Sequence, residues 1–257
     1  MAEAVLKTEH LYKNFGGVAA VKDFSFQAEA GSLTAIIGPN GAGKTTIFNL
    51  ISRIYKPDRG TVWLEGRDIT AMSQIETARL GISRTFQNTR LFTGLSVLDN
   101  VKVALDFAGG YTMLEAMLLL PRRWKREKVI RERALGCLRL LNLDHYADSR
   151  PSSLPYGIQR RVEIARALVS DPKVLMLDEP AAGLNPEEVL QLGDFIREIQ
   201  RKYPKLAILV IEHRMDLVMN LSDYIYVQDF GETIAQGVPE EIRTNPMVLK
   251  AYLGEEA

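Results

Sequence analysis

Residues 33–54 read LTAIIGPNGAGKTTIFNLISRI: an apolar run, then a glycine-rich stretch, then a segment whose apolar residues have helical spacing. Within it, GPNGAGKTT (38–46) fits the pattern G-x-x-x-x-G-K-[ST]. Between a strand and a helix, this pattern is typical of a loop that wraps a phosphate, because glycines let backbone N–H groups turn inward and the helix presents its positive end. The stretch therefore predicts a nucleotide phosphate site on a strand–loop–helix unit.

Each position of this loop has an expected role. Lys44 should reach the β- and γ-phosphate oxygens, and Thr45 should offer its hydroxyl to Mg²⁺. The other predicted nucleotide-binding positions are Gly38, Pro39, Asn40, Gly41, Ala42, Gly43 and Thr46. The alternative is a glycine-rich turn with an incidental lysine, which the flanking strand and helix patterns disfavour.

A second apolar run, KVLMLDEP (173–180), ends in two adjacent acids. In open parallel sheets, ligands bind at the carboxyl ends of the strands. Asp178 is therefore predicted to hold Mg²⁺ through water, and Glu179 to polarise an attacking water. Adjacent acids can also merely cap a strand, and the matching phosphate loop makes that alternative the weaker one.

Strand and helix patterns alternate along much of the chain. The pairs are 33–37 with 44–54, 173–180 with 186–200, and 206–213 with 215–222. Continuous apolar strands joined by helices predict an α/β fold with a mostly parallel sheet covered on both faces. Three runs look instead like antiparallel strands with glycine turns: 5–15, 18–31 and 60–69. Residues 97–150 show helical spacing only, so we expect a helical subdomain, about 97–165, inserted in the α/β core.

Composition is that of an ordinary globular protein: 257 residues, 46% hydrophobic and 25% charged. The 32 Lys and Arg balance the 32 Asp and Glu, so no nucleic-acid partner is expected. The N-terminus has no signal-peptide pattern, and the longest apolar stretch, 111–121, is about half of the ~20 residues that a membrane span needs. The single cysteine, Cys137, is interpreted as a small core residue of a cytoplasmic protein.

The order of these motifs resembles the ATP-binding cassette family across essentially the whole chain. The resemblance implies one cassette domain over 1–257 with a RecA-like P-loop NTPase core, ATP and Mg²⁺ as ligands, and ATPase activity. It implies that Gln87 in RTFQ links Mg²⁺ to a transport partner, and that His213 in LVIEH contacts the γ-phosphate and orients the water. AGLN (182–185) stands where the family usually has SALD, and LPYGI (154–158) where it has LSGGQ.

The family also stacks adenine on an aromatic residue shortly before its second strand. YKNFGG offers two candidates, and Phe15, immediately before Gly16, has the better register. Tyr12 is the second choice. Stacking between an aromatic ring and a base contributes ~1 to 3 kcal/mol and tolerates either ring type. The alternative role for Phe15 is a core aromatic at a strand end.

The LPYGI segment departs from the family pattern. Family members pair head to tail, and the signature of each grips the γ-phosphate bound to the other. Only Leu154 and Gly157 match here, while Pro155, Tyr156 and Ile158 differ. A hydrogen bond to a charged group contributes ~1.5 to 3 kcal/mol, so the missing serine hydroxyl matters. Our hypothesis is that free backbone amides after Gly157 bind the partner's nucleotide. The alternative is that this half-site is inactive and only structural.

Four stretches of the sequence are similar to the larger ATP-binding subunit of bacterial branched-chain amino acid importers: LPYG.QRR.EIARAL, DEPAAGLNP, EHRMD and AYLGE. This resemblance implies a second, smaller cassette partner in a heterodimer, with a homodimer possible. It also implies two membrane permease subunits, an extracytoplasmic binding protein as indirect partner, and a place on the cytoplasmic face of the inner membrane. Urea, short amides and lipopolysaccharide stay open as alternative substrates. A soluble non-transport ATPase and a regulatory subunit with little turnover stay open as rival functions.

One charged run is left unassigned. PRRWKREKVIRER (121–133) has seven basic and two acidic residues. It fits a solvated helix face, and it equally fits contact with anionic headgroups or an acidic patch on a membrane subunit.

Overall fold

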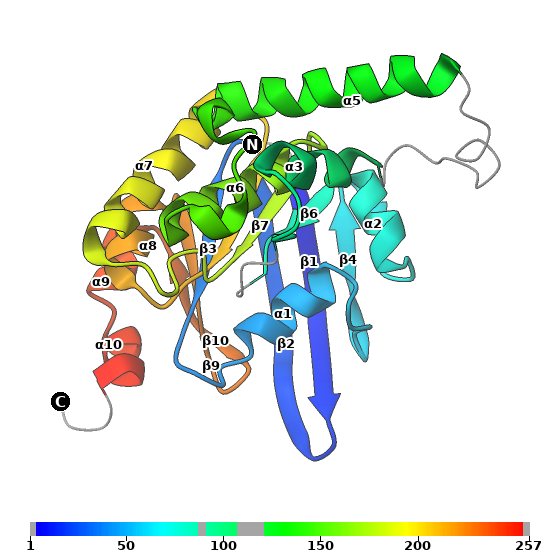
Figure 1. Cartoon of the computed structure of the whole chain (residues 1–257). Coiled ribbons are helices and arrows are strands. Elements are labelled where there is room, and N and C mark those ends of the chain that lie inside the picture. The colour runs from blue at the N-terminus through cyan, green and yellow to red at the C-terminus, as the bar shows by residue number, and fades with distance from the viewer. Residues whose placement is uncertain (1–3, 87–90, 107–120, 254–257) are drawn as a thin grey trace. The chain divides into compact units, whose positions relative to one another are not determined.

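The computed structural model describes residues 4–86, 91–106 and 121–253 of the chain (Figure 1). It divides into two compact units, the first made of residues 1–87 and 173–257 and the second of residues 88–172. The second unit includes the helical insertion expected at about 97–165 and extends beyond it at both ends. Gln87 and most of the apolar stretch 111–121 lie outside the described residues.

A six-stranded sheet with the order β10-β9-β3-β8-β7-β6 forms the centre of the first unit. Its strands are β3 (Leu33–Ile37), β6 (Ile82–Arg84), β7 (Val174–Asp178), β8 (Ala207–Ile211), β9 (Tyr224–Asp229) and β10 (Glu232–Gly237). All neighbours are parallel except β10, which pairs antiparallel with β9 at the edge. Every residue of β3, β7 and β8 is buried, as expected of strands covered on both faces. The predicted mostly parallel sheet is confirmed.

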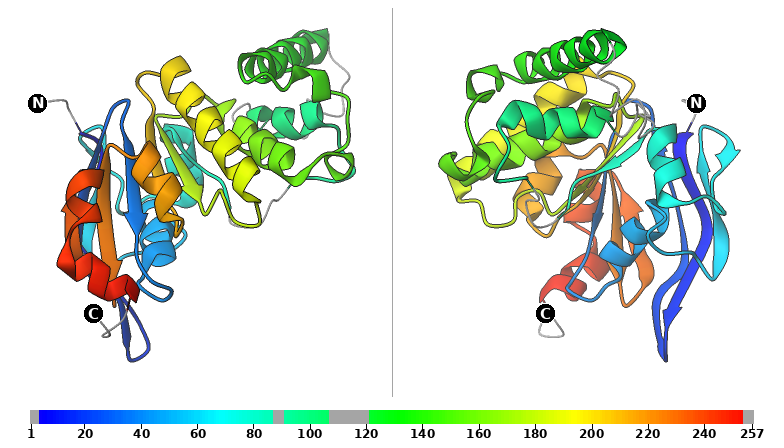
Figure 2. Two further views of the ribbon diagram at one scale, coloured as in Figure 1. Left: turned by 90° about the vertical axis from the view of Figure 1, so that its left-hand side faces the viewer. Right: turned by 45° about the vertical axis from the view of Figure 1, so that its right-hand side comes forward.

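A second, antiparallel sheet has the order β2-β1-β4-β5. It consists of β1 (Ala4–Phe15), β2 (Val18–Glu29), β4 (Arg59–Leu64) and β5 (Arg67–Asp68). Figure 2 shows the long hairpin of β1 and β2, in which Phe15 pairs with Val18 across a two-residue glycine turn. The predicted antiparallel subdomain is therefore also confirmed.

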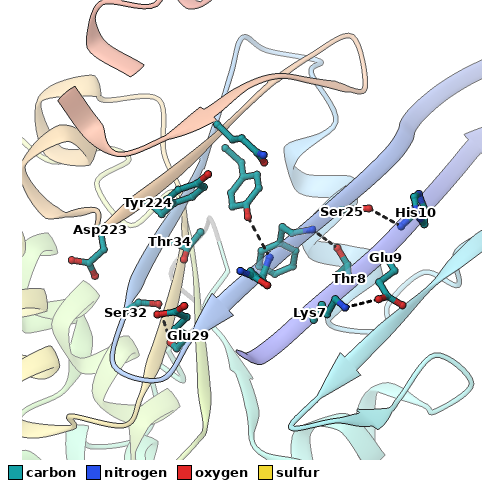
Figure 3. A pocket seen from close by; sticks show the side chains of 14 residues that line it. Lys7, Thr8, Glu9, His10, Ser25, Glu29, Ser32, Thr34, Asp223 and Tyr224 are labelled. Carbon is teal, nitrogen blue, oxygen red and sulfur yellow. Dashed lines mark hydrogen bonds and ion pairs between the residues drawn. The ribbon is translucent and has the colours of Figure 1, made fainter. Parts of the chain in front are cut away.

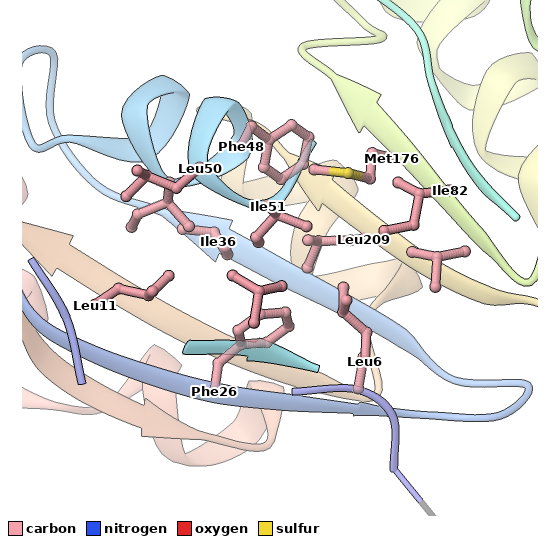
Figure 4. Close-up of a cluster of buried hydrophobic side chains, with 14 of the residues drawn as sticks. Leu6, Leu11, Phe26, Ile36, Phe48, Leu50, Ile51, Ile82, Met176 and Leu209 are labelled. Carbon is pink, nitrogen blue, oxygen red and sulfur yellow. The ribbon is translucent and has the colours of Figure 1, made fainter. Parts of the chain in front are cut away.

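Helices of the first unit pack their apolar residues against these sheets. They are α1 (Lys44–Ile51), α2 (Gln74–Leu80), α7 (Pro186–Lys202), α8 (Met215–Leu221), α9 (Pro239–Arg243) and α10 (Pro246–Leu253). In Figure 4, Phe48 and Ile51 of α1 lie among Ile36 and Leu209 of the parallel sheet and Phe26 of the antiparallel sheet. Fully burying such a side chain contributes roughly 1.5–3 kcal/mol. This shared core fixes the start of α1, and with it the glycine-rich loop.

Every regular element among the described residues of the second unit is a helix or a 3₁₀ turn. It comprises α3 (Val97–Asp106), α5 (Pro121–Leu140), α6 (Tyr156–Leu168) and the short 3₁₀ turns η1 (Asp144–Tyr146) and η2 (Pro151–Ser153). Val101, Ala134 and Ala165, one from each long helix, are fully buried. Cys137 is buried too, with its Sγ 3.6 Å from the carbonyl oxygen of Ala165, which confirms it as a core residue. Among the described residues of the chain, no helix combines the length and apolarity needed to cross a membrane.

Candidate functional site

The loop between β3 and α1 is held by close backbone contacts. Gly38 has φ 149°, and a Cβ on it would lie 2.0 Å from the carbonyl oxygen of Gln228. Gly43 has φ 95°, and a Cβ there would lie 2.2 Å from the carbonyl oxygen of Ala20. Only glycine fits at both positions, because any other residue would have to displace backbone. The loop is thus clasped between the start of β2 and the end of β9.

Lys44 is the first residue of α1 and is only 7% exposed. Its Nζ donates hydrogen bonds to the carbonyl oxygens of Gly38 (2.7 Å) and Pro39 (2.8 Å), so the ammonium lies over the loop. Burial lowers the pKa of Lys44, and the negative charge of Glu179 opposes that shift. A cationic group, a helix start and a glycine-lined backbone converge here, and this combination fits the phosphates of a nucleotide.

The remaining loop positions differ in exposure. Ala42 is buried and its carbonyl oxygen accepts the N–H of Gly231 at 3.2 Å, which ties the loop to the turn between β9 and β10. Asn40, Gly41 and Thr45 are exposed, and Thr46 is half-buried. The hydroxyl proposed for Mg²⁺ is therefore accessible.

Three predicted groups lie at the carboxyl ends of the parallel strands. The glycine-rich loop follows β3, Asp178 ends β7 with Glu179 directly after it, and His213 lies two positions beyond the end of β8. Because β3, β8 and β7 are parallel neighbours, their carboxyl ends are adjacent. The N–H of Glu179 donates to the carbonyl oxygen of Ile211 at 2.9 Å, which joins the ends of β7 and β8. The sequence-predicted acids, lysine and histidine thus share one edge.

Asp178 has a partner that the sequence analysis did not identify. Arg84, at the end of β6, forms an ion pair with Asp178 Oδ2 at 2.6 Å, and the two side chains are 7% and 6% exposed. The same guanidinium donates from Nη1 to Asn49 Oδ1 (2.7 Å) and Ser52 Oγ (2.9 Å). Arg84 therefore links α1, which follows the phosphate loop, to the acid predicted to hold Mg²⁺.

Aromatic rings complete the surroundings of Arg84. Its guanidinium carbon lies 5.5 Å from the ring centroid of Phe48 and 5.4 Å from that of Phe86, within the range of cation–π contacts. The sequence signal was an arginine inside a short strand of a buried sheet, since a buried charge requires a partner. What the sequence could not indicate was which acid would pair with it.

A second unpredicted residue, the acid Glu212, precedes His213. The side chain of Glu212 is fully buried, and its Oε1 accepts the N–H of Ala181 at 2.7 Å while Oε2 accepts the N–H of His213 at 3.1 Å. Burial raises the pKa of Glu212, and these backbone N–H groups oppose the shift. The side chain of His213 itself is 54% exposed. An acid directly after the all-apolar run AILVI was the available signal.

Of the two aromatic candidates for adenine, Phe15 is the more accessible. Phe15 is 43% exposed at the end of β1, whereas Tyr12 is half-buried. Tyr55 packs edge-on against Phe15, with ring centroids 5.2 Å apart, and Lys13 Nζ lies 5.5 Å from the Phe15 centroid. Phe15 pairs with Val18, two residues before the alanine that contacts the phosphate loop. The hairpin end thus presents an aromatic ring near the loop.

In the second unit, LPYGI begins α6 with Pro155 as its N-cap and no side-chain capping hydrogen bond. The N–H groups of Ile158 and Gln159 donate to the carbonyl oxygen of Pro155 at 3.0 and 3.1 Å. The prediction of free amides after Gly157 is therefore wrong, because those amides close the first helical turn. Within the described residues, the N–H groups of Tyr156 and Gly157 have no acceptor, as expected of a helix start.

Side chains of α6 brace this start. Gln159 Nε2 donates to the carbonyl oxygen of Leu154 at 2.9 Å. The guanidinium of Arg160 lies 5.3 Å from the ring centroid of Tyr156 and pairs with Glu163 at 3.1 Å. Tyr156 is nevertheless 37% exposed. The segment offers backbone and an aromatic ring to its surroundings, and no hydroxyl in the place of the family serine.

The AGLN segment forms a turn followed by a capped helix. Asn185 caps α7, with a reciprocal pair of hydrogen bonds to Glu188 at 2.9 and 3.0 Å, and Pro186 is the first helical residue. The helical pattern expected over 186–200 is confirmed, and the cap and the proline define where the helix begins. Gln87 and the side chains of residues 121–125 lie outside the described part of the chain, so the interpretations of RTFQ and of the basic run stay predictions.

A separate pocket of about 680 Å³ lies in the first unit (Figure 3). It is lined by residues of β1, β2, β3, β9 and β10 and by none of the predicted site residues. Three of its charged groups have partners: Lys7 pairs with Glu9 at 2.5 Å, and Asp223 Oδ2 accepts the N–H of Leu33 at 2.7 Å. This pocket is therefore distinct from the edge of the sheet that carries the predicted nucleotide site.

Comparison with known protein families gives two matches. Residues 21–182 match the model described as "ABC transporter", and residues 232–257 match the model described as "Branched-chain amino acid ATP-binding cassette transporter". The first covers the glycine-rich loop, the helical unit and the strand-terminal acids. The second covers β10, α9 and α10.

Relatives and solved structures agree with these matches. The high-affinity branched-chain amino acid transport ATP-binding protein LivG of Salmonella typhimurium is 43% identical over 99% of this chain and 100% of its own length. BraF of Pseudomonas aeruginosa, with the same description, is 41% identical over 99% of this chain and 100% of its own length. The ADP conformation of MJ1267, an ATP-binding cassette of an ABC transporter, has a TM-score of 0.84 and 34% identity, covering 98% of this chain and 99% of that one.

Proposed function

Because this chain belongs to the ABC transporter family, whose ATP-binding cassette it forms, we propose that it is the ATP-hydrolysing subunit of an importer of branched-chain amino acids. One observation carries the proposal: a phosphate loop, an Asp-Glu pair and a histidine lie at the adjacent carboxyl ends of three parallel strands. The match of residues 232–257 and the descriptions of LivG and BraF support the substrate class.

ATP binding begins with the loop between β3 and α1. Its inward N–H groups and the start of α1 bind the β-phosphate, and Lys44 exchanges its two carbonyl partners for β- and γ-phosphate oxygens. The adenine stacks on Phe15, whose exposed ring lies at the hairpin end that contacts the loop. Both contacts are made by the first unit alone.

The residues present fit a magnesium ion bound together with ATP. Thr45 would supply a hydroxyl and Gln87 a side-chain amide, and Asp178 would hold the ion through water; these are the hard oxygen groups that Mg²⁺ prefers. When bound, Mg²⁺ neutralises charge on the β- and γ-phosphate oxygens. Arg84 binds Oδ2 of Asp178, so Oδ1 is the oxygen that would be offered to the ion or its water.

Hydrolysis uses the groups beside the γ-phosphate. Glu179 polarises the attacking water, and His213 contacts the γ-phosphate and orients that water. The negative charge of Glu179 opposes the lowering of the Lys44 pKa, and this interaction between the carboxylate and the ammonium supports a role for both beside the phosphates. General-base assistance of this kind contributes about 10²–10⁴ in rate.

Pairing with a second cassette completes the site. LPYGI docks on the nucleotide of a partner cassette and holds it through the N–H groups of Tyr156 and Gly157. The partner is a smaller cassette protein, with a homodimer as the alternative. The pair works at the cytoplasmic face of the membrane with two permease subunits, and an extracytoplasmic binding protein delivers the amino acid.

Reconstitution tests this proposal. The chain is assembled in proteoliposomes with its cassette partner, the permease subunits and the binding protein, and uptake of labelled leucine is followed with ATP supplied on the side of the cassettes. We expect ATP-dependent uptake that unlabelled isoleucine and valine compete away, and none with Lys44→Ala. Uptake of urea or an amide but not of leucine would refute the proposed substrate class. Leucine uptake that persists with Lys44→Ala would refute the proposal that ATP hydrolysis by this chain drives transport.

A further inference from the structure

One buried carboxylate contacts both loops that carry the hydrolytic groups. Glu212 directly follows β8, and its side chain is fully buried. Its Oε1 accepts the N–H of Ala181, at 2.7 Å, in the turn that begins at Glu179. Its Oε2 accepts the N–H of His213 at 3.1 Å and, at the longer distance of 3.5 Å, that of Arg214.

The carboxylate of Glu212 is suited to join these two loops. A charged group in a protein interior is unfavourable unless hydrogen bonds satisfy it, and here backbone donors satisfy both oxygens. An apolar side chain would fill the end of β8 equally well but would leave the N–H groups of Ala181 and His213 without acceptors. A hydroxyl side chain has only one oxygen. A carboxylate offers two separate acceptor oxygens, and here each oxygen accepts from a different loop.

The turn after β7 needs such support. Glu179 has φ 46°, a left-handed conformation that is uncommon for residues other than glycine and persists only where the surroundings impose it. Its N–H is bound by the carbonyl oxygen of Ile211 at 2.9 Å, and its carbonyl oxygen accepts the N–H of Ala182 at 3.1 Å. The contact between Ala181 and Glu212 is the side-chain anchor within this turn.

We propose that Glu212 is a positioning residue that ties the turn carrying Glu179 to the loop carrying His213, so that the two groups keep one geometry around the γ-phosphate. The inference rests on the proposed roles of Glu179 and His213. Glu212 itself does not touch nucleotide. It acts through backbone, by fixing the starting points of two side chains that do.

The substitution Glu212→Gln tests this link in the full chain assembled with its partner subunits. Glutamine keeps the size of the side chain, but its NH₂ group cannot accept, so one of the two loops loses its anchor. Because small misplacements of reacting groups are costly, we expect kcat for ATP to fall about 10- to 100-fold. The KM for ATP should stay within about twofold, since the phosphate loop is untouched.

Asp223→Asn is the matched control. Asp223 also accepts a backbone N–H, that of Leu33 at 2.7 Å, but at the opposite end of the same parallel sheet. This variant should retain the wild-type kcat. A double-mutant cycle with His213→Ala adds a readout that a merely structural role would not move. If Glu212 acts through His213, the loss caused by Glu212→Gln should become markedly smaller in the His213→Ala background.

Amide hydrogen exchange provides a readout that is independent of catalysis. The amides of Ala181 and His213 should both be protected in the wild type, and one of them should exchange faster in Glu212→Gln. If the wild type hydrolysed no ATP, the proposed function would fail while the exchange data still decided the link. The proposal would be overturned if amide exchange or kcat were unchanged in Glu212→Gln. It would also be overturned if kcat, ATP affinity and thermal stability fell together, or if the losses caused by Glu212→Gln and His213→Ala simply multiplied in the cycle.

Discussion

Lys44 at the start of α1 and Tyr156 at the start of α6 both follow a loop, but their surroundings differ. Lys44 is buried and donates to two loop carbonyls, and the charge of Glu179, which follows β7, opposes the lowering of its pKa by burial. Tyr156 is 37% exposed and follows a proline cap with no side-chain hydrogen bond. The first helix start is completed by its own unit, because parallel strands bring distant residues to one edge. The second offers backbone N–H groups and an exposed ring, as the proposed contact with a partner cassette would require.

The largest expected effect is on the rate of ATP hydrolysis and concerns the groups at the carboxyl ends of the parallel strands. Glu179→Gln should lower kcat about 10²- to 10⁴-fold while ATP still binds, because the amide cannot accept a proton from water. Steady-state ATPase assays and nucleotide binding measure the two quantities separately. Lys44→Ala is the contrasting variant, in which binding itself should fail. Wild-type turnover by Glu179→Gln would show that the strand ends are not where hydrolysis occurs.

The buried ion pair of the same site should matter for stability. Arg84→Met leaves Asp178 charged, buried and unpaired, so the free energy of unfolding should fall by about 3–5 kcal/mol in denaturant titrations. Adding Asp178→Asn to Arg84→Met should recover part of that loss, since both charges are then gone. If Arg84→Met unfolds at the wild-type denaturant concentration, the site does not depend on this pair.

Removing the exposed ring should weaken nucleotide binding rather than turnover. Phe15→Ala is expected to cost ~1–3 kcal/mol in ATP affinity through lost stacking, measurable by titration calorimetry. Phe15→Tyr should bind as the wild type does, because either ring stacks. An equal loss in Tyr12→Ala, with none in Phe15→Ala, would reverse the assignment of the two aromatics.

Asp58 should make the end of β1 sensitive to acid. A hydrogen bond from Lys13 Nζ, followed by one from the N–H of Asn14, lowers the pKa of Asp58 below its ordinary value. A lowered carboxyl pKa stabilises the fold above the unfolded pKa of about 4 and loses this contribution as pH falls through the folded value. The stability advantage of the wild type over Asp58→Asn should therefore shrink on acidification. An advantage independent of pH would contradict this.

The smallest expected effect on kcat is that of a substitution at the start of α6. Pro155→Ser restores the family hydroxyl, and if backbone amides already hold the nucleotide, kcat should change by no more than about twofold. A crippled half-site would instead gain a charged hydrogen bond worth about 1.5–3 kcal/mol, which corresponds to roughly tenfold or more. ATPase assays of the assembled complex distinguish the two, and a large gain would show that LPYGI is a defective site.

Agreement between sequence and structure is best where a feature is local. The loop at 38–46, the apolar strands and the helix expected over 186–200 depend on residues a few positions apart, so their spacing predicted them correctly. At α6 the same local reasoning failed in detail. It placed free amides after Gly157, but helix geometry consumes the amides of Ile158 and Gln159 in the first turn.

By itself, the sequence determined the α/β fold, the phosphate loop and the acids at the end of β7, because strand periodicity and glycine spacing are written in consecutive residues. Only the tertiary structure decided that Arg84 pairs with Asp178, 94 positions away, and that Glu212 accepts the N–H of Ala181, 31 positions away. The physical reason is that a buried charge must find a partner, and which partner it finds depends on how the chain brings its strand ends together.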